Sequence, residues 1–513
     1  MKINKSGITF GVIGGLLTFL FGGWSVAIIG TLMGVGLGMG LGGKFERKDP
    51  FKIAVAVLPT ALVAGVILVA FSLYQNNFVQ EAIGKRPAKA NIVLYGNLIG
   101  FLGTILFTAL LAGLHGLSTK LEQQWKMVLL AILIVAFPFV DKLTALRWTA
   151  QIIFALIFVI LGLGLNIVVG YAGLLDLGYA AFFAIGAYTT GFLASPVHGF
   201  HVNFWLVIWI AAGMAAIWGF MLGAPTLPLR GDYLAIVTLG FGEIVPVLFK
   251  NLIDITIKEP FTCWILPMFR IQTSCITFVE HYDLTFGEKG ISPIDRPVLP
   301  FIGAFQSSNP IPWYFLIIAI ILLSVFIIRR LRDSRLGRAW MAIREDELAA
   351  AQMGIDPVKT KLAAFAMGAT FSGFAGAFYA AYIAGIFPSV FDFSVSIIIL
   401  CVVILGGIGN INGVIVGGLV IMTADRLFLP ALKDFLASLL KHTILPSISN
   451  PVVQLAVKDN ANPILYRFLL FGLTLVIMMA VRPEGLIPNE QVRAELHPDE
   501  EPAELKTPKA VKG

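Results

Sequence analysis

Charged side chains are scarce in this sequence, and that scarcity excludes a soluble protein. Only 13% of the 513 residues are charged, 58% are hydrophobic, and the mean hydropathy is +0.87. Soluble domains of this length do not have such a composition. Several apolar stretches reach the roughly 20 residues that a helix needs to cross a bilayer, where the backbone must satisfy its own hydrogen bonds. The sequence therefore predicts an all-α, polytopic membrane protein, a helical bundle of roughly 11–14 spans.

Cysteine, histidine and the motifs of catalysis are also scarce or missing. The three cysteines are too few for a disulfide framework. Cys401 lies in an apolar run, whereas Cys263 and Cys275 lie in a polar segment that we place outside the cell, so this pair is a candidate disulfide. The sequence has neither H-E-x-x-H nor G-x-S-x-G, and no Cys/His pair has the spacing of a metal or nucleophilic site. We therefore expect neither a catalytic nor a metal site in this chain.

A nucleotide-binding loop is missing as well. Gly38, Gly40 and Gly43 form a G-x-G-x-x-G string followed by Lys44, but Phe45 occupies the place where a P-loop needs serine or threonine for magnesium. No predicted strand precedes these glycines. If ATP drives this protein, a separate chain must bind ATP and Mg²⁺, and we expect no cofactor in this one.

What the sequence does contain is a polar segment, Arg329–Lys361, between long apolar runs. Leu336, Trp340 and Ile343 recur at helical spacing, which predicts an amphipathic helix over 335–343. Cytoplasmic loops of membrane proteins are enriched in arginine, so we place this segment in the cytoplasm. Its arginines are Arg329, Arg330, Arg332, Arg335, Arg338 and Arg344. An ordinary basic loop would explain these arginines but not the helix that follows.

A second short helix is predicted from about residue 344 to residue 353. Asp346 and Glu347 stand in its first turn, where negative charge suits the helix dipole, and Gly354 ends it. Asp356 and Pro357 are typical of the N-cap and first residue of the next span. We therefore expect a short, rigid helix that is held between two membrane spans and projects into water.

The string REDELAAAQMG, residues 344–354, resembles the cytoplasmic coupling loop of ABC-importer permeases, which fits into a cleft on the ATPase subunit. Glu347 lies seven residues before Gly354, where the general pattern has six. The variant found here is similar to the branched-chain amino-acid permeases of the LivM type. The resemblance implies that the loop couples this chain to an ATPase. The implied coupling residues are Arg344, Glu345, Asp346, Glu347, Ala350 and Gly354.

Other strings along the chain resemble the same family. They are NIVVGYAGLLDLGYAAFFAIGAY (166–188), RGDYLAIVTLGFGEIV (230–245), TFGEKGI (285–291), LGGIGNINGVIVG (405–417) and RPEGLIP (482–488). The resemblance covers about 145–256 and 286–488. The polar stretch between these parts looks like an insertion.

Polar residues and glycines within the predicted spans are candidates for the substrate pathway. A polar side chain at membrane depth is costly unless it faces protein or a water-filled cavity, and interrupted helices line the transport sites of many carriers. Glu243 is the strongest candidate for a buried carboxylate in the pathway. Alternatively, Asn166 and Glu243 only cross-link helices, and Gly406–Gly409 is only a tight turn. The candidates are Asn166, Gly170, Gly173, Asp176, Gly178, Thr238, Gly240, Glu243, Gly406, Gly407 and Gly409.

The organisation that follows has three parts. We expect N-terminal membrane spans that form a peripheral scaffold (1–144), a permease core (145–488) and a disordered cytoplasmic tail (489–513). Within the core we expect external loops at 256–311 and 429–463 and the cytoplasmic coupling loop at 332–361.

The resemblance implies a permease subunit of an ATP-driven importer for leucine, isoleucine or valine in the bacterial inner membrane. Its implied partners are a LivH-like second permease, two ABC ATPases and a periplasmic binding protein, besides membrane lipid. No nucleic acid is needed to explain the net charge of +7, because basic cytoplasmic loops account for it. Two alternatives remain. Related permeases carry urea or short amides, and a stand-alone secondary transporter would use Glu243 or Asp176 for ion coupling but would not explain the coupling loop.

Overall fold

A computed structural model describes most of the predicted core. The described residues are 131–132, 134–139, 141–142, 148–226, 232–253, 255–258, 277–299, 303–430, 433, 463–481 and 484–487. Most of the predicted N-terminal scaffold (1–144), the candidate disulfide Cys263–Cys275 and the C-terminal tail lie outside them. The chain divides into two compact units, Met1–Arg147 with Asp434–Leu455 and Trp148–Lys433 with Ala456–Gly513. Almost all described residues belong to the second unit.

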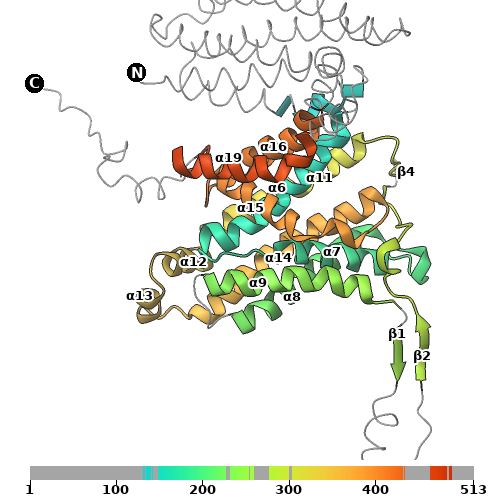
Figure 1. Cartoon of the computed structure of the whole chain (residues 1–513), viewed down its shortest axis with the longest axis horizontal. Helices are drawn as coiled ribbons and strands as arrows, with labels where there is room; N and C mark the ends of the chain where they lie inside the picture. The colour runs from blue at the N-terminus through green and yellow to red at the C-terminus, as the bar shows by residue number, and fades with distance from the viewer. Residues whose placement is uncertain are drawn as a thin grey trace, which may run out of the picture. The chain divides into compact units, whose positions relative to one another are not determined.

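Helices make up most of the described part of the chain (Figure 1). Among the described residues, six helical segments are long and apolar enough to cross a membrane. They are Trp148–Tyr171, Phe204–Pro225, Tyr233–Asn251, Ile311–Arg332, Pro357–Ile383 and Pro388–Gly406. This confirms the predicted all-α, polytopic membrane fold. The total of roughly 11–14 spans stays a prediction, because the first quarter of the chain lies outside the described residues.

The elements have the following bounds. The α-helices are α6 (Trp148–Leu165), α7 (Tyr179–Leu193), α8 (Phe204–Thr226), α9 (Asp232–Asn251), α11 (Ile311–Arg332), α12 (Arg335–Glu345), α13 (Glu347–Gln352), α14 (Pro357–Ile383), α15 (Phe393–Gly406), α16 (Ile411–Thr423) and α19 (Arg467–Val481). The described residues also form the π-helices η1 (Asn166–Tyr171) and η6 (Ala424–Phe428) and the short 3-10 turns η2 (Pro196–His198), η4 (Gly287–Lys289), η5 (Pro388–Val390) and η9 (Pro463–Tyr466). In the same part of the chain, β1 (Ile255–Lys258) pairs with β2 (Thr277–Tyr282), and β3 (Val298–Leu299) pairs with β4 (Gly303–Ala304), both antiparallel.

Helix α14 lies at the centre of the bundle and contacts α6, α7 and α8. Small residues recur along it every four positions and are buried, and they let neighbouring backbones approach closely. They are Gly368, Ser372, Gly376 and Ala380. A Cβ on Gly376 would collide with the backbone of α7, and the Tyr179 hydroxyl donates a hydrogen bond to the Gly368 carbonyl at 2.7 Å. The small-residue repeat therefore forms a close-packing face of α14.

The predicted helix break near Gly406 separates α15 from α16. Gly407 and Gly409 have φ angles of 120° and 79°, which residues with a Cβ rarely adopt. Asn410 then caps α16, because its side-chain oxygen accepts hydrogen bonds from the backbone N–H groups of Asn412 and Gly413 at 3.0 and 3.3 Å. Two glycines and one capping asparagine therefore form the interruption between α15 and α16.

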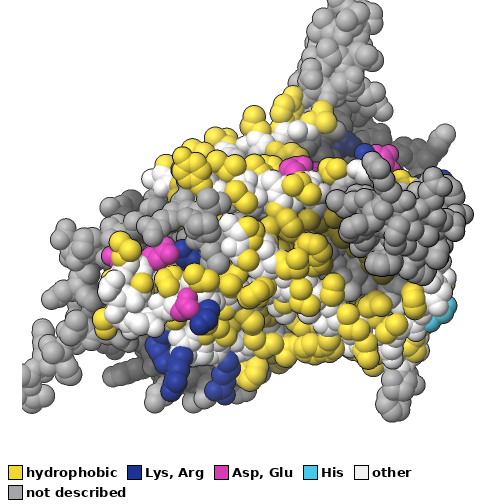
Figure 2. Space-filling view, turned by 90° about the horizontal axis from the view of Figure 1, so that it is seen from below, with side chains coloured by type: hydrophobic (Ala, Val, Ile, Leu, Met, Phe, Trp, Pro, Cys, Tyr) yellow, Lys and Arg dark blue, Asp and Glu magenta, His cyan; other side chains and the backbone are white. Residues whose placement is uncertain are grey.

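The two ends of the bundle carry different structures. Helices α12 and α13 follow α11, which ends at Arg332, and they lie at the left end of the bundle in Figure 1. Figure 2 shows a group of Lys and Arg side chains toward that end, beside a largely hydrophobic flank. At the C-terminal end of α9, Lys250 forms an ion pair with Glu288 of η4. The hydrogen bond and the charge of Lys250 hold the pKa of Glu288 below its usual value. Ile291 and Ile386 form an isolated antiparallel bridge there.

Candidate functional site

Helix α12 is fixed at its start and along one face. Its N-cap is Ser334, whose side-chain oxygen accepts a hydrogen bond from the Gly337 N–H at 3.3 Å. Trp340 is fully buried, and its ring N–H donates to the Thr360 carbonyl of α14 at 2.8 Å. The amphipathic pattern predicted this helix over 335–343, and the structure extends it to Glu345.

Helix α13 begins later than the sequence suggests. Asp346 is its N-cap, because one carboxylate oxygen accepts hydrogen bonds from the N–H groups of Leu348 and Ala349 at 2.8 and 3.0 Å. The predicted start at residue 344 is wrong, since Arg344 and Glu345 belong to α12. Local charge placement could not distinguish a capping Asp from one inside the first turn. The predicted stop at Gly354 is confirmed by its φ of 84°.

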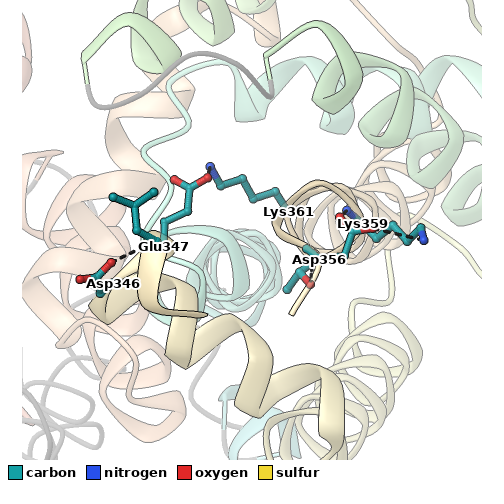
Figure 3. Close-up of polar contacts among 7 residues, drawn as sticks. Asp346, Glu347, Asp356, Lys359 and Lys361 are labelled. Atoms are coloured by element: carbon teal, nitrogen blue, oxygen red, sulfur yellow. Dashed lines mark hydrogen bonds and ion pairs between the residues drawn. The ribbon is translucent and has the colours of Figure 1, made fainter. Parts of the chain in front are cut away.

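An ion pair joins α13 to the N-terminal part of the next span, α14. The Glu347 carboxylate lies 2.7 Å from the Lys361 ammonium, and the Lys361 side chain is only 7% exposed (Figure 3). Ala350 is buried on the same side. Asp356 caps α14 by accepting the Lys359 N–H at 3.2 Å, and these contacts with Lys359 hold the pKa of Asp356 below its usual value. The loop is therefore held at both ends by contacts within the chain.

The same loop touches the predicted pathway. The Arg344 guanidinium donates a hydrogen bond to the Gly170 carbonyl at 2.7 Å, at the end of η1. Gly173 has a φ of 70°, and a Cβ there would lie 2.8 Å from Cγ of Arg344. Helices α12 and α13 are thus connected directly to the break between α6 and α7.

The outer side of α13 stays open. Leu348 and Met353 are 63% and 84% exposed, although both are apolar. Contacts within the chain fix one side of the loop and leave these two side chains available to another molecule. We refer to residues 332–361, which contain α12 and α13, as the coupling loop.

The Gly178 region and α9 hold each other in place. Asp176 is buried, and its carboxylate accepts a hydrogen bond from the Gly178 N–H at 2.9 Å, just before α7 begins. The Leu177 N–H donates to the Thr238 hydroxyl at 3.1 Å, and Gly178 packs against Gly242 of α9. Within the described part of the chain, Asp176 therefore shapes the start of a helix, and its place in a pathway stays a prediction.

Asn166 connects two helix interruptions. It is fully buried, and its side-chain oxygen accepts a hydrogen bond from the Gly409 N–H at 2.8 Å. Gly406 and Gly407 pack on the backbone of 484–487, where the Ile487 N–H donates to the Gly406 carbonyl at 3.1 Å. These residues have the geometry of helix cross-linking and a tight turn, and a further role in transport stays a prediction.

Glu243 does not lie where the sequence suggests. We expected a buried carboxylate, and the structure exposes Glu243 on the outer face of α9, one turn after the exposed Gly240. The prediction of burial within this chain is wrong, because the sequence shows that a carboxylate interrupts an apolar span but not which side of the span the rest of the chain covers.

The sequence analysis did not predict three contacts of the coupling loop: Trp340 with Thr360, Glu347 with Lys361, and Arg344 with Gly170. The Lys361 contact had a detectable signal, because a lysine at the start of an apolar span needs a partner once it is buried. The other two end on backbone carbonyls, which no residue pattern marks.

Comparison with known proteins places the chain in a family. The family model described as "Branched-chain amino acid transport system / permease component" matches residues 149–478. The high-affinity branched-chain amino acid transport system permease protein LivM of Escherichia coli (strain K12) is 34% identical over 473 residues, which cover 87% of this chain and 97% of that protein. LivM of Salmonella typhimurium is 34% identical over 74% of this chain and 78% of its own length.

A shorter match connects the chain with a second type of permease. LivH of Escherichia coli (strain K12) is 30% identical over 127 residues, 25% of this chain and 40% of that protein. No solved structure matches. The long match to LivM, together with the family model across the helical bundle, establishes that this chain belongs to the branched-chain amino-acid transport permeases of the LivM type.

Proposed function

We propose that this chain is the LivM-like permease subunit of an ATP-driven importer for leucine, isoleucine and valine in a bacterial inner membrane. In that assembly it pairs with a LivH-like permease, two cytoplasmic ATPases that bind ATP and Mg²⁺, and a periplasmic binding protein. Support comes from the names of its relatives and from the match that extends over nearly the full length of one of them.

The observation that carries the proposal is the coupling loop. It has a rigid inner side, made by the Asp346 cap and the Glu347–Lys361 ion pair, and an open apolar side at Leu348 and Met353. A soluble subunit that contacts the open side can displace α13 as a unit, because caps and an ion pair resist local unfolding.

The contacts of the coupling loop also indicate which other segments would move when α13 is displaced. Arg344 ties the coupling loop to Gly170, and the break after η1 is tied in turn to α9 through Leu177 and Thr238. Closure of the ATPase pair would therefore move the segments around Gly170–Gly178 and Thr238–Glu243 together. Alternation between outward and inward openings is the expected result.

The test is reconstitution of the complete complex in liposomes. We expect ATP-dependent uptake of radiolabelled leucine that requires this chain, the second permease, both ATPases and the binding protein. Omission of the ATPases is the matched control and should abolish uptake. Ion-driven uptake by this chain alone would contradict the proposal and support a secondary transporter.

A further inference from the structure

The outer face of α9 is apolar and exposed apart from two residues. Exposed apolar side chains recur along it at helical spacing, on one face of the helix. They are Tyr233, Ile236, Val237, Ile244, Val247 and Leu248. Gly240 and Glu243 lie in the middle of this stripe and are also exposed. We refer to these eight residues as the outer stripe.

Glu243 lies near the middle of α9, which is long and apolar enough to cross a membrane. Helix α9 runs over 20 residues, and Glu243 stands eleven positions after its first residue, about 16 Å along a helix of about 30 Å. Among the described residues, no hydrogen bond or ion pair reaches its carboxylate. A carboxylate at this depth that faced lipid tails would be costly, so the outer stripe must face a polar group outside the described part of this chain.

The surroundings of the carboxylate suit a particular kind of ligand. Gly240 has no side chain, and apart from its chain neighbours and the backbone of α9 no atom lies within 4 Å of where its Cβ would be, so there is space beside Glu243. Ile236 and Ile244 border that space with branched apolar side chains that are 61% and 64% exposed. A carboxylate next to an apolar surface complements a molecule that carries an ammonium group and a branched hydrocarbon.

The inner side of the same helix is part of the connected segment. Thr238 and Gly242 contact Leu177 and Gly178 at the break between α6 and α7, and that break reaches the coupling loop through Arg344. A group bound on the outer stripe would therefore move when the coupling loop moves. A site that only held two subunits together would not need this connection.

We propose that Glu243 binds the ammonium group of the amino acid in transit, with Ile236 and Ile244 contacting its branched side chain, at a site that the second permease completes. This inference rests on the proposed function. A charge-assisted hydrogen bond from the ammonium to the carboxylate replaces the hydration that the ammonium loses on entering the membrane.

The first test uses the complete reconstituted complex with Glu243→Gln and Glu243→Asp. With Glu243→Gln we expect leucine uptake per ATP hydrolysed to fall by about tenfold or more, because an amide cannot supply a charge-assisted bond. Assembly with the second permease and stimulation of ATPase activity by the binding protein should persist. Glu243→Asp should restore part of the uptake. Glu288→Gln removes a carboxylate at the end of the bundle, beyond α9, and should leave uptake unchanged.

A second measurement distinguishes ligand binding from a structural role. Saturation-transfer NMR on the permease complex in nanodiscs, without binding protein, should detect L-leucine more strongly than 4-methylpentanoate, which has the same hydrocarbon but no ammonium group. Glu243→Gln should remove that difference. Unchanged uptake, an unchanged preference for leucine, or loss of the second permease from the Glu243→Gln complex would each overturn the inference. Failure of the unsubstituted complex to import leucine would instead overturn the proposed function.

Discussion

The coupling loop and the outer stripe of α9 are both exposed, yet they differ in what holds them. In the coupling loop, caps at Ser334 and Asp346 and the Glu347–Lys361 ion pair fix the backbone from within the chain. On the outer stripe, the carboxylate of Glu243 has no such partner among the described residues. The chain itself fixes the backbone of the first surface, whereas in our proposal the second surface is half of a site.

This difference separates two kinds of substitution. Changes on the coupling loop should affect the attachment of the ATPases, the stability of the loop or, at Arg344, the transmission of its movement to η1. Changes on the outer stripe should affect transport without detaching the ATPases.

The largest effect should come from the open side of α13. The double substitution Leu348→Arg with Met353→Arg places two charges where an apolar contact with the ATPase is expected. Because unpaired charges in an interface are costly, we expect ATP-dependent leucine uptake to fall by about 100-fold. ATPase retention on the affinity-purified permease pair measures the cause directly. Met353→Leu keeps the surface apolar and serves as the control, and normal ATPase retention by the double variant would show that this surface is not the contact.

Reversal of the charge at Glu347 should have the next largest effect. Glu347→Arg leaves the largely buried Lys361 beside a second positive charge, which should lower the free energy of unfolding by about 3 kcal/mol. Thermal unfolding of the purified complex measures the change. The charge exchange Glu347→Lys with Lys361→Glu should recover part of it, and an unshifted unfolding curve for Glu347→Arg would mean that the ion pair does not support the loop.

Loss of the contact between the coupling loop and η1 should weaken transmission. Arg344→Met removes the hydrogen bond to Gly170, worth about 2 kcal/mol for a charged donor, and we expect leucine imported per ATP to fall by about tenfold. The ATPases should stay attached, since Leu348 and Met353 are untouched. Arg338→Met is a matched control, because within the described part of the chain the Arg338 guanidinium donates only to the Asp333 carbonyl, inside the same loop. Equal coupling ratios in the two variants would contradict the proposed connection.

The smallest effect concerns the cap at Asp356. Its pKa is lowered in the folded chain by hydrogen bonds from Lys359. The charged cap therefore adds stability at pH values above the ordinary range of aspartate, and this contribution is lost as the pH falls through the lowered pKa. Unfolding temperatures measured along a falling pH series should drop slightly more for the parent chain than for Asp356→Asn, whose amide caps without titrating. Parallel curves would show that the cap does not contribute.

Local physics explains how much of the coupling loop could be predicted. The stop at Gly354, the cap at Asp356 and the break after Gly406 follow from residues whose backbone preferences act within one turn. The structure reproduces them closely. The start of α13 was missed by three residues, because Asp346 suits both a cap and a first turn.

The sequence could not predict which face of a helix the rest of the chain buries. The apolar pattern of α9 marks a span, but Thr238 is buried and Glu243 is exposed although both are polar and only five positions apart. Burial depends on where α7 and the α6–α7 break pack, and those contacts join residues about 60 positions apart in the sequence, such as Leu177 and Thr238. The contact between Arg344 and Gly170 was missed for the same reason.

Labelling that shows which side of the membrane Met353 faces is the most direct test of the proposed ATP-driven mechanism. A Met353→Cys variant, with Cys263, Cys275 and Cys401 replaced by serine, can be treated with a membrane-impermeant maleimide in intact spheroplasts and in inverted vesicles. We predict labelling in inverted vesicles alone, and protection of the cysteine when the ATPase subunits are bound. Labelling from outside the cell, or labelling that the ATPases do not affect, would contradict a coupling loop that binds an ATPase in the cytoplasm.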